Sequence, residues 1–158
     1  MAFKDILVHA DADGRRDARF ALTVELARKH EAHAIGLFAL EFAELPGYVS
    51  AQISPNLLDR ARDSYLAQAQ SAREALEAEA ERAGVPCEWR QEEGTALELL
   101  RKHGRYTDLI VVSQPNSHED GARAEGFPGE LALTGGRPVL AIPYAGAHAG
   151  LGTNVLIA

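Results

Sequence analysis

The polar residues of this sequence that could bind or attack a ligand follow two short apolar runs. Asp11 comes shortly after the run 6–8, and Ser113 and Gln114 come directly after the run 109–112. Both runs are aliphatic and lack polar alternation, which is typical of parallel strands covered on both faces. Because loops at the carboxyl ends of such strands form the ligand crevice, we expect Asp11, Ser113 and Gln114 to line one.

Ser113 and Asp11, together with His9 in the first strand, are of the residue types found in a hydrolytic triad. The serine, however, does not stand in a Gly-x-Ser-x-Gly turn, which would present it as a nucleophile. Asp11 has a second interpretation, because aspartate also favours turns and helix starts. The chain shows no combined set of base, phosphate cradle and metal carboxylate. We therefore predict no catalytic residues and no enzymatic activity.

A metal site is a further possibility that the spacing argues against. His118, Glu119 and Asp120 are consecutive in a predicted loop, so their side chains point apart, whereas a metal needs spaced, convergent ligands. Cys87 is the single cysteine, which excludes an internal disulfide and a multi-cysteine metal site. It falls in a predicted strand, where a cysteine is usually an inert buried residue. We predict no metal.

Composition restricts the class of protein. A chain of 158 residues fits one domain with a real core. Its net charge of −7 disfavours a sequence-independent grip on nucleic acid. No apolar run approaches the roughly 20 residues that span a bilayer, and no secretory signal opens the sequence. We expect a cytoplasmic protein that binds neither nucleic acid nor membranes.

Apolar runs alternate with amphipathic segments in the order βαβαβαβαβ, which predicts an α/β fold with a five-stranded, doubly wound parallel sheet. Strands are expected near residues 6–8, 33–40, 87–91, 107–112 and 138–143, with helices over 16–30 and 54–83, from 95, and over 127–133. In the first helix, Ala18, Leu22 and Leu26 predict the buried stripe. The second helix is long enough to overhang a sheet, with its end in solvent or against a second subunit.

The end of the chain predicts an additional element. Residues 1–144 form the expected domain, and residues 145–153 are a Gly/Ala-rich linker. Residues 154–158 resemble residues 5–9, with a polar residue followed by three branched aliphatic ones. This similarity predicts an extra carboxyl-terminal strand that begins a second repeat, as in a tandem protein. The alternative is a tail strand unrelated to duplication.

The apolar runs also carry a family resemblance. Residues 4–8 with Asp11, residues 107–112 and residues 137–143 resemble the universal stress protein family, and the likeness extends over nearly the whole chain to Pro143. The resemblance implies a five-stranded fold of the adenine-nucleotide alpha-hydrolase type, arranged as dimers or tandem repeats. It also implies that some members bind ATP or AMP after the first and fourth strands.

The sequence departs from the motif of the nucleotide-binding members. Those members carry Gly-x2-Gly, nine residues and then Gly-Ser or Gly-Thr, and the glycines let backbone amides approach phosphate. Here Ser113 and Asn116 stand at the first two glycine positions, and glutamate and glycine stand at 125–126. The loop also gains carboxylates, which repel phosphate. Asp11 keeps the position of the family's adenosine-contacting aspartate.

These features predict a non-catalytic, universal-stress-protein-like domain without a cofactor. We expect it to act in stress response through dimerisation or partner association. An exposed edge strand invites pairing, so we expect a homodimer through strand five and the carboxyl-terminal strand, over residues 138–158. The alternative is an ATP- or AMP-binding module with a rearranged phosphate loop, which would use Asp11 and backbone amides near Ser113 and Gln114.

Overall fold

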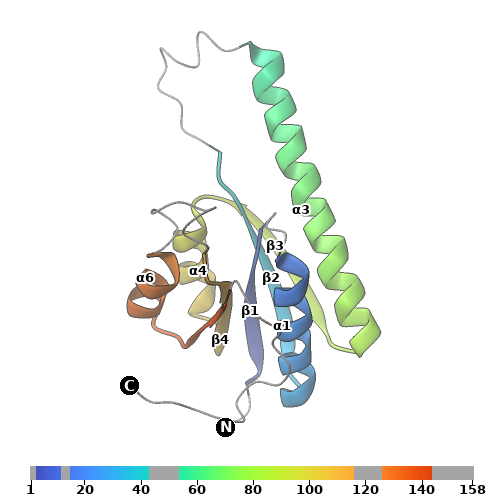
Figure 1. Ribbon diagram of the computed structural model, residues 1–158, viewed down its shortest axis with the longest axis vertical. Helices are drawn as coiled ribbons and strands as arrows, with labels where there is room; N and C mark the ends of the chain where they lie inside the picture. The colour runs from blue at the N-terminus through green and yellow to red at the C-terminus, as the bar shows by residue number, and fades with distance from the viewer. Residues whose placement is uncertain (1–2, 12–14, 43–53, 116–125, 144–158) are drawn as a thin grey trace.

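The computed structural model describes residues 3–11, 15–42, 54–115 and 126–143. Strands and helices alternate along these residues (Figure 1). The elements are β1 (Asp5–Ala10), α1 (Arg16–His30), β2 (His33–Leu40), α3 (Pro55–Ala83), β3 (Cys87–Glu93), α4 (Ala96–Gly104), β4 (Leu109–Ser113), α6 (Phe127–Thr134) and β5 (Val139–Ile142). The predicted linker 145–153 and the predicted strand 154–158 lie outside the described residues.

The five strands form one parallel sheet in the order β3-β2-β1-β4-β5. From β1 the chain adds β2 and then β3 on one side, and afterwards crosses to place β4 and β5 on the other. The boundary between β1 and β4, with Ile6 opposite Leu109, is therefore the point where the strand order reverses. The predicted doubly wound fold is confirmed.

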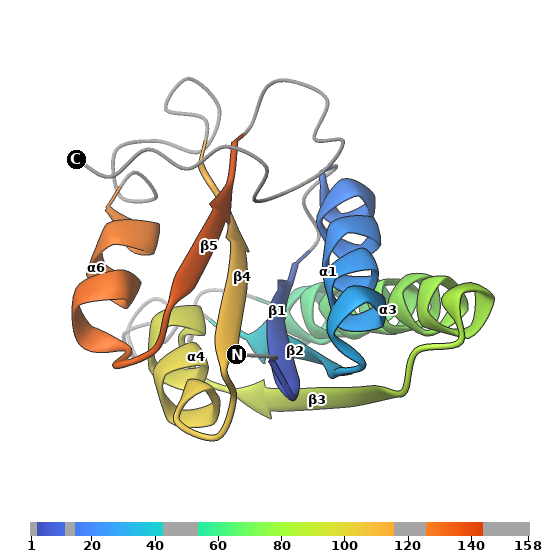
Figure 2. The ribbon, with the colours of Figure 1, turned by 90° about the horizontal axis from the view of Figure 1, so that it is seen from below.

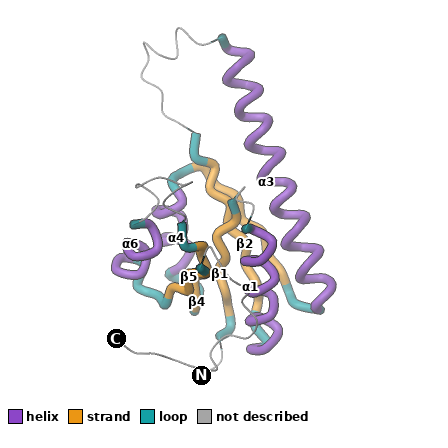
Figure 3. Tube along the Cα trace, in the orientation of Figure 1, coloured by secondary structure: helices purple, strands orange, loops and turns teal. Residues whose placement is uncertain are grey.

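Two layers of helices enclose the sheet (Figures 2 and 3). Helices α1 and α3 cover one face, and α4 and α6 cover the other. Successive residues of β1 supply both cores, because side chains alternate along a strand. Ile6 and Val8 join the core beneath α1 and α3, whereas Leu7 joins the core beneath α4 and α6. Burial on both faces explains why the sequences of β1, β2 and β4 lack polar alternation.

Helix boundaries follow local sequence signals. Ser54 precedes Pro55 at the start of α3, where the fixed backbone angle of proline suits the first turn. The helix ends at Gly84, whose φ of 66° lets its N–H reach the carbonyl oxygen of Ala80. At the start of α4, the hydroxyl of Thr95 accepts a hydrogen bond from the backbone N–H of Glu98 at 3.3 Å. This bond caps the first turn of α4.

Helix α3 begins well beyond the sheet, as the sequence predicts (Figure 1). The described side chains over 56–64 are exposed, and Leu57 is 61% accessible. From Ala69 onward the apolar stripe is buried, with Leu76 fully inaccessible. Leu76 and Trp89 pack on Gly36 of β2 so closely that an added Cβ would lie 2.5 Å from the Leu76 side chain. The second half of α3 is therefore the part that holds the sheet.

The buried stripe of α1 differs from the prediction. Leu22 and Leu26 are buried, but Ala18 is exposed, and Arg19 beside it is fully buried. Helix periodicity alone predicts that a charged residue such as Arg19 faces solvent. A guanidinium can nevertheless be buried where a carboxylate compensates its charge, and Asp11 does so here.

The amino-terminal ends of β1 and β4 are joined through Asp108. Its carboxylate accepts hydrogen bonds from the backbone N–H groups of Lys4, at 2.7 Å, and Asp5, at 3.2 Å. The Asp108 N–H in turn donates to the Asp5 carbonyl oxygen at 2.8 Å. The bond from Lys4, followed by the bond from Asp5, lowers the pKa of the Asp108 carboxyl below its ordinary value.

Replacing Leu76 with alanine should lower the free energy of unfolding by about 2–5 kcal/mol, because it leaves a cavity between α3 and the sheet. Leu57→Ala, an identical change in the exposed part of the same helix, should change it by less than about 0.5 kcal/mol. Urea unfolding followed by circular dichroism measures both values. Equal losses in the two variants would contradict the assignment of α3's second half as the anchored part.

Asp108→Asn should lower the free energy of unfolding at pH 7 by about 1 kcal/mol, since the amide accepts the two backbone bonds less strongly. A carboxyl whose pKa is depressed on folding stabilises the fold above its unfolded pKa of about 3.9, and this contribution is lost as pH falls through the folded pKa. Urea unfolding between pH 7 and pH 2.5 should therefore show a shallower acid decline in Asp108→Asn. Asp63→Asn, on the exposed part of α3, should keep the wild-type slope.

Candidate functional site

The carboxyl ends of β1 and β4 meet at one side chain that the sequence argument did not single out. Arg19, in the first turn of α1, donates from Nη2 to Oδ1 of Asp11 at 2.6 Å. Its Nη1 donates to the hydroxyl oxygen of Ser113, the last residue of β4. Two of the three predicted site residues thus converge on one guanidinium at the point where the strand order reverses.

Burial distinguishes Arg19 from the residues that it contacts. The Arg19 side chain is 0% accessible, whereas that of Asp11 is 32% accessible. A guanidinium withdrawn from water needs a negative partner and hydrogen-bond acceptors, and Asp11 and Ser113 supply them. The Nε atom of Arg19 is buried and has no hydrogen-bond partner in the described part of the chain.

His9 and Phe127 extend the cluster towards α6. The Nδ1 atom of His9 lies 3.4 Å from Oδ2 of Asp11, so both carboxylate oxygens of Asp11 have neighbours. The imidazole ring packs against the ring of Phe127, with 5.6 Å between the centroids. Because Phe127 is the first residue of α6, the cluster brings together residues at or next to β1, α1, β4 and α6.

Gln114 takes a different position from the other two predicted residues. Its side chain is exposed, and its backbone N–H donates to the carbonyl oxygen of Ile142 at 2.7 Å. That bond extends the pairing of β4 with β5. The amide of Gln114 is thus engaged within the sheet, which leaves it a poor donor for a phosphate.

The contacts of Ser113 bear on its chemistry. A serine nucleophile needs a neighbouring base that can take its proton. Arg19 has donors only and stays protonated in proteins, so it cannot serve as that base. Cys87 is not an activated nucleophile either, because burial, followed by the charges of Glu77 and Glu88, raises the pKa of its thiol to about 11.

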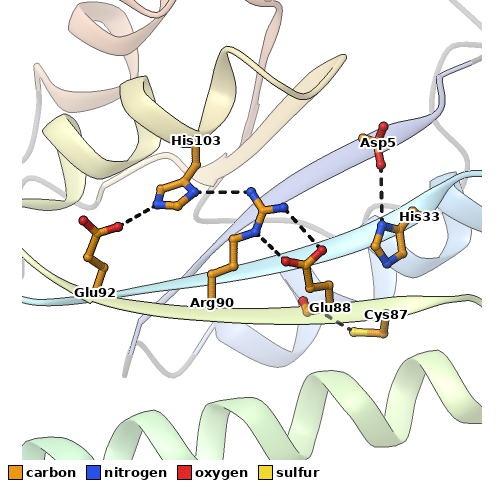
Figure 4. A network of polar contacts seen from close by, with 7 residues as sticks. All are labelled: Asp5, His33, Cys87, Glu88, Arg90, Glu92 and His103. Carbon is orange, nitrogen blue, oxygen red and sulfur yellow. Dashed lines mark hydrogen bonds and ion pairs between the residues drawn. The ribbon is translucent and has the colours of Figure 1, made fainter.

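A second cluster of charged residues joins β3 to α4 (Figure 4). Arg90 donates from Nε to Glu88 at 2.7 Å, and its Nη1 lies 3.3 Å from Nδ1 of His103. Because arginine only donates, Nδ1 accepts, and Nε2 of His103 donates to Glu92 at 2.9 Å. The bonds from Lys102 and then His103 lower the pKa of the Glu92 carboxyl.

The position of β3 explains this chain of ion pairs. β3 is an edge strand, and alternate charged residues are half-exposed on its face towards α4. Charges on an edge strand protect it against pairing with another chain.

Over the described ranges, no group of three or more His, Cys, Asp or Glu residues could hold a metal. The loop residues His118, Glu119 and Asp120 lie outside those ranges.

Arg19 carries a sequence signal that the pattern argument passed over. It shares a helix line with Thr23 and Ala27, which are both buried. A charged residue on such a line requires a counter-charge nearby, and Asp11 stands eight residues earlier in the sequence. No helix among the described residues is both long and apolar enough to cross a membrane.

Comparisons with known proteins agree on the fold. UspA from Lactobacillus plantarum aligns with a TM-score of 0.73 at 19% identity, covering 90% of this chain and 99% of that one. A universal stress protein from Archaeoglobus fulgidus in complex with dAMP gives 0.62 at 14% identity, covering 90% and 99%. An Arabidopsis thaliana family member with AMP bound gives 0.61 at 15% identity, covering 89% and 91%. No protein-family model and no curated protein matches the sequence.

Proposed function

We propose that this chain, which has the fold of the universal stress proteins, is a non-catalytic domain of that type that acts in stress response by associating with a partner. The observation that supports this most is how the predicted ligand-binding residues are hydrogen-bonded. Two of the three residues expected to meet a ligand, Asp11 and Ser113, are both bonded to the buried side chain of Arg19. The positions that would hold a nucleotide are thus used within the protein.

The edge at β5 is the surface that we assign to association. β5 pairs with β4 on one side, and no other described strand lies beyond it. Its residues Val139 and Leu140 are only half-buried, and Ala141 is exposed. Leu133 on the adjoining helix α6 is 88% accessible. Whereas β3 carries charges along its edge, β5 is apolar and has no further strand beside it among the described residues, which favours pairing with a second copy.

Light scattering during size exclusion should give about twice the chain mass of 17.0 kDa if β5 joins two copies. Ala141→Glu should shift the protein towards monomer, because a two-fold interface would bring the two carboxylates close together. Ala67→Glu, the same change at an exposed position of α3, should leave the dimer intact. A wild-type mass of one chain at every concentration would contradict the proposed association.

Adenine-nucleotide binding is the second candidate function. Two of the solved structures with this fold contain AMP or dAMP, and a third universal stress protein structure is a complex with cAMP. Asp11 also stands at the carboxyl end of β1, beside the point where strand order reverses. For this function, a nucleotide would have to separate Asp11 from Arg19 and could then pair its phosphate with the guanidinium.

Calorimetric titration with AMP and ATP separates the two candidates. Under the leading proposal, wild-type protein should bind either nucleotide more weakly than about 1 mM, because Asp11 is already paired. Asp11→Asn, which keeps the shape of the side chain, should give the same result, with circular dichroism confirming its fold. Micromolar binding by the wild type that disappears in Asp11→Asn would instead establish the nucleotide-binding function.

A further inference from the structure

We infer that the Arg19 side chain fills the crevice between β1 and β4 and is the residue that excludes nucleotides from it. This inference rests on the proposed function, in which the wild-type crevice holds no nucleotide. It adds a specific cause and predicts that a smaller residue at this one position restores binding.

The geometry places Arg19 where a ligand would lie. Ligands of open parallel sheets bind outside the carboxyl ends of the strands, where the strand order reverses. Arg19 touches one residue from each side of that point, Asp11 after β1 and Ser113 at the end of β4. A ligand that bonded both Oδ1 of Asp11 and the Ser113 hydroxyl would have to compete with the guanidinium for both partners.

The size and burial of Arg19 make displacement unfavourable. Arg19 is the largest of the fully buried side chains in the described part of the protein. A ligand that moved it aside would have to provide new partners for a buried positive charge and for the carboxylate of Asp11. It would also need space that the side chain now fills.

The unsatisfied Nε atom marks this position as more than an ordinary structural ion pair. Buried polar atoms nearly always have hydrogen-bond partners. The Nε of Arg19 is buried and has none within the described ranges, although the other two guanidinium nitrogens are bonded. The surroundings of Arg19 thus provide partners for two of its three guanidinium nitrogens and none for the third.

Shortening residue 19 should leave a polar cavity with a defined preference. Its walls would include the Asp11 carboxylate, which accepts hydrogen bonds, and the Ser113 hydroxyl, which both accepts and donates. Ribose hydroxyl groups match these partners, and so does a free guanidinium ion, which has the shape and charge of the group removed. The cavity should thus take either a nucleoside phosphate or guanidinium, but not both at once.

The test uses Arg19→Ala with two matched variants. Arg19→Met keeps most of the bulk, and Arg73→Ala makes the same change at an exposed arginine of α3. Calorimetry should show AMP binding to Arg19→Ala at least about tenfold tighter than to wild type, Arg19→Met or Arg73→Ala. A few millimolar guanidinium chloride should raise the melting temperature of Arg19→Ala alone, relative to sodium chloride at equal ionic strength, and should weaken its AMP binding.

Several results would overturn the inference. A folded Arg19→Ala that gains neither AMP binding nor stabilisation by guanidinium would do so while leaving the proposed function intact. AMP binding by Arg19→Met as tight as by Arg19→Ala would do so as well, because the crevice would still be filled. Tight AMP binding by the wild type that weakens in Arg19→Ala would overturn both proposals, since Arg19 would then be a ligand-binding residue.

A second variant provides for the case in which Arg19→Ala does not fold. Arg19→Ser introduces a hydroxyl that can bond the carbonyl oxygen of Arg15, as the Thr23 hydroxyl bonds that of Arg19 at 2.8 Å. The same expectations apply to it, with AMP binding and guanidinium stabilisation as the two measurements. Loss of folding in both small variants, with no recovery in guanidinium, would also contradict the inference, because the position would then be structural only.

Discussion

The ion pair between Arg19 and Asp11 is the interaction on which the centre of this molecule depends. A guanidinium that is fully withdrawn from water is tolerated only beside a compensating charge. Asp11 directly follows β1 and Arg19 lies in the first turn of α1, so the pair fixes how the helix is placed relative to the strand. The bond to Ser113 extends the same constraint to β4. One side chain thus sets the relative positions of three elements at the point where the strand order reverses.

The pair β1–β4 is held at both ends, by different means. At the amino-terminal end, the partly exposed carboxylate of Asp108 accepts two backbone bonds. At the carboxyl end, the buried guanidinium of Arg19 donates to side chains. The outer strands of the sheet differ in another way, because β3 carries ion pairs along its exposed face, whereas β5 offers apolar side chains. This asymmetry makes β5 the more suitable edge for a partner.

Much of this architecture can be predicted from the sequence, because the physics that determines it is local. Aliphatic runs without alternation indicate parallel strands, and Gly84 and Thr95 mark helix boundaries by their own backbone and side-chain preferences. The crevice is harder to predict, because Arg19 and Ser113 are 94 positions apart in the chain. The nearby sequence indicates a counter-charge for the guanidinium, because Asp11 stands eight residues before Arg19, but it does not indicate the bond to Ser113. The buried face of α1 was mispredicted at Ala18, because helix periodicity takes no account of a counter-charge on another element.

The buried arginine also limits what a shared fold says about ligands. The solved structures compared here have the same sheet at 14–19% identity, and some of them contain adenine nucleotides. In open parallel sheets, ligands bind outside the carboxyl ends of the strands where the strand order reverses, which here is at β1 and β4. Whether that crevice is available depends on the volume and charge of a few side chains, which a backbone comparison does not measure. In this chain the residue at position 19 brings its own cation and hydrogen-bond donors to Asp11, so the backbone provides a site that the side chain already fills.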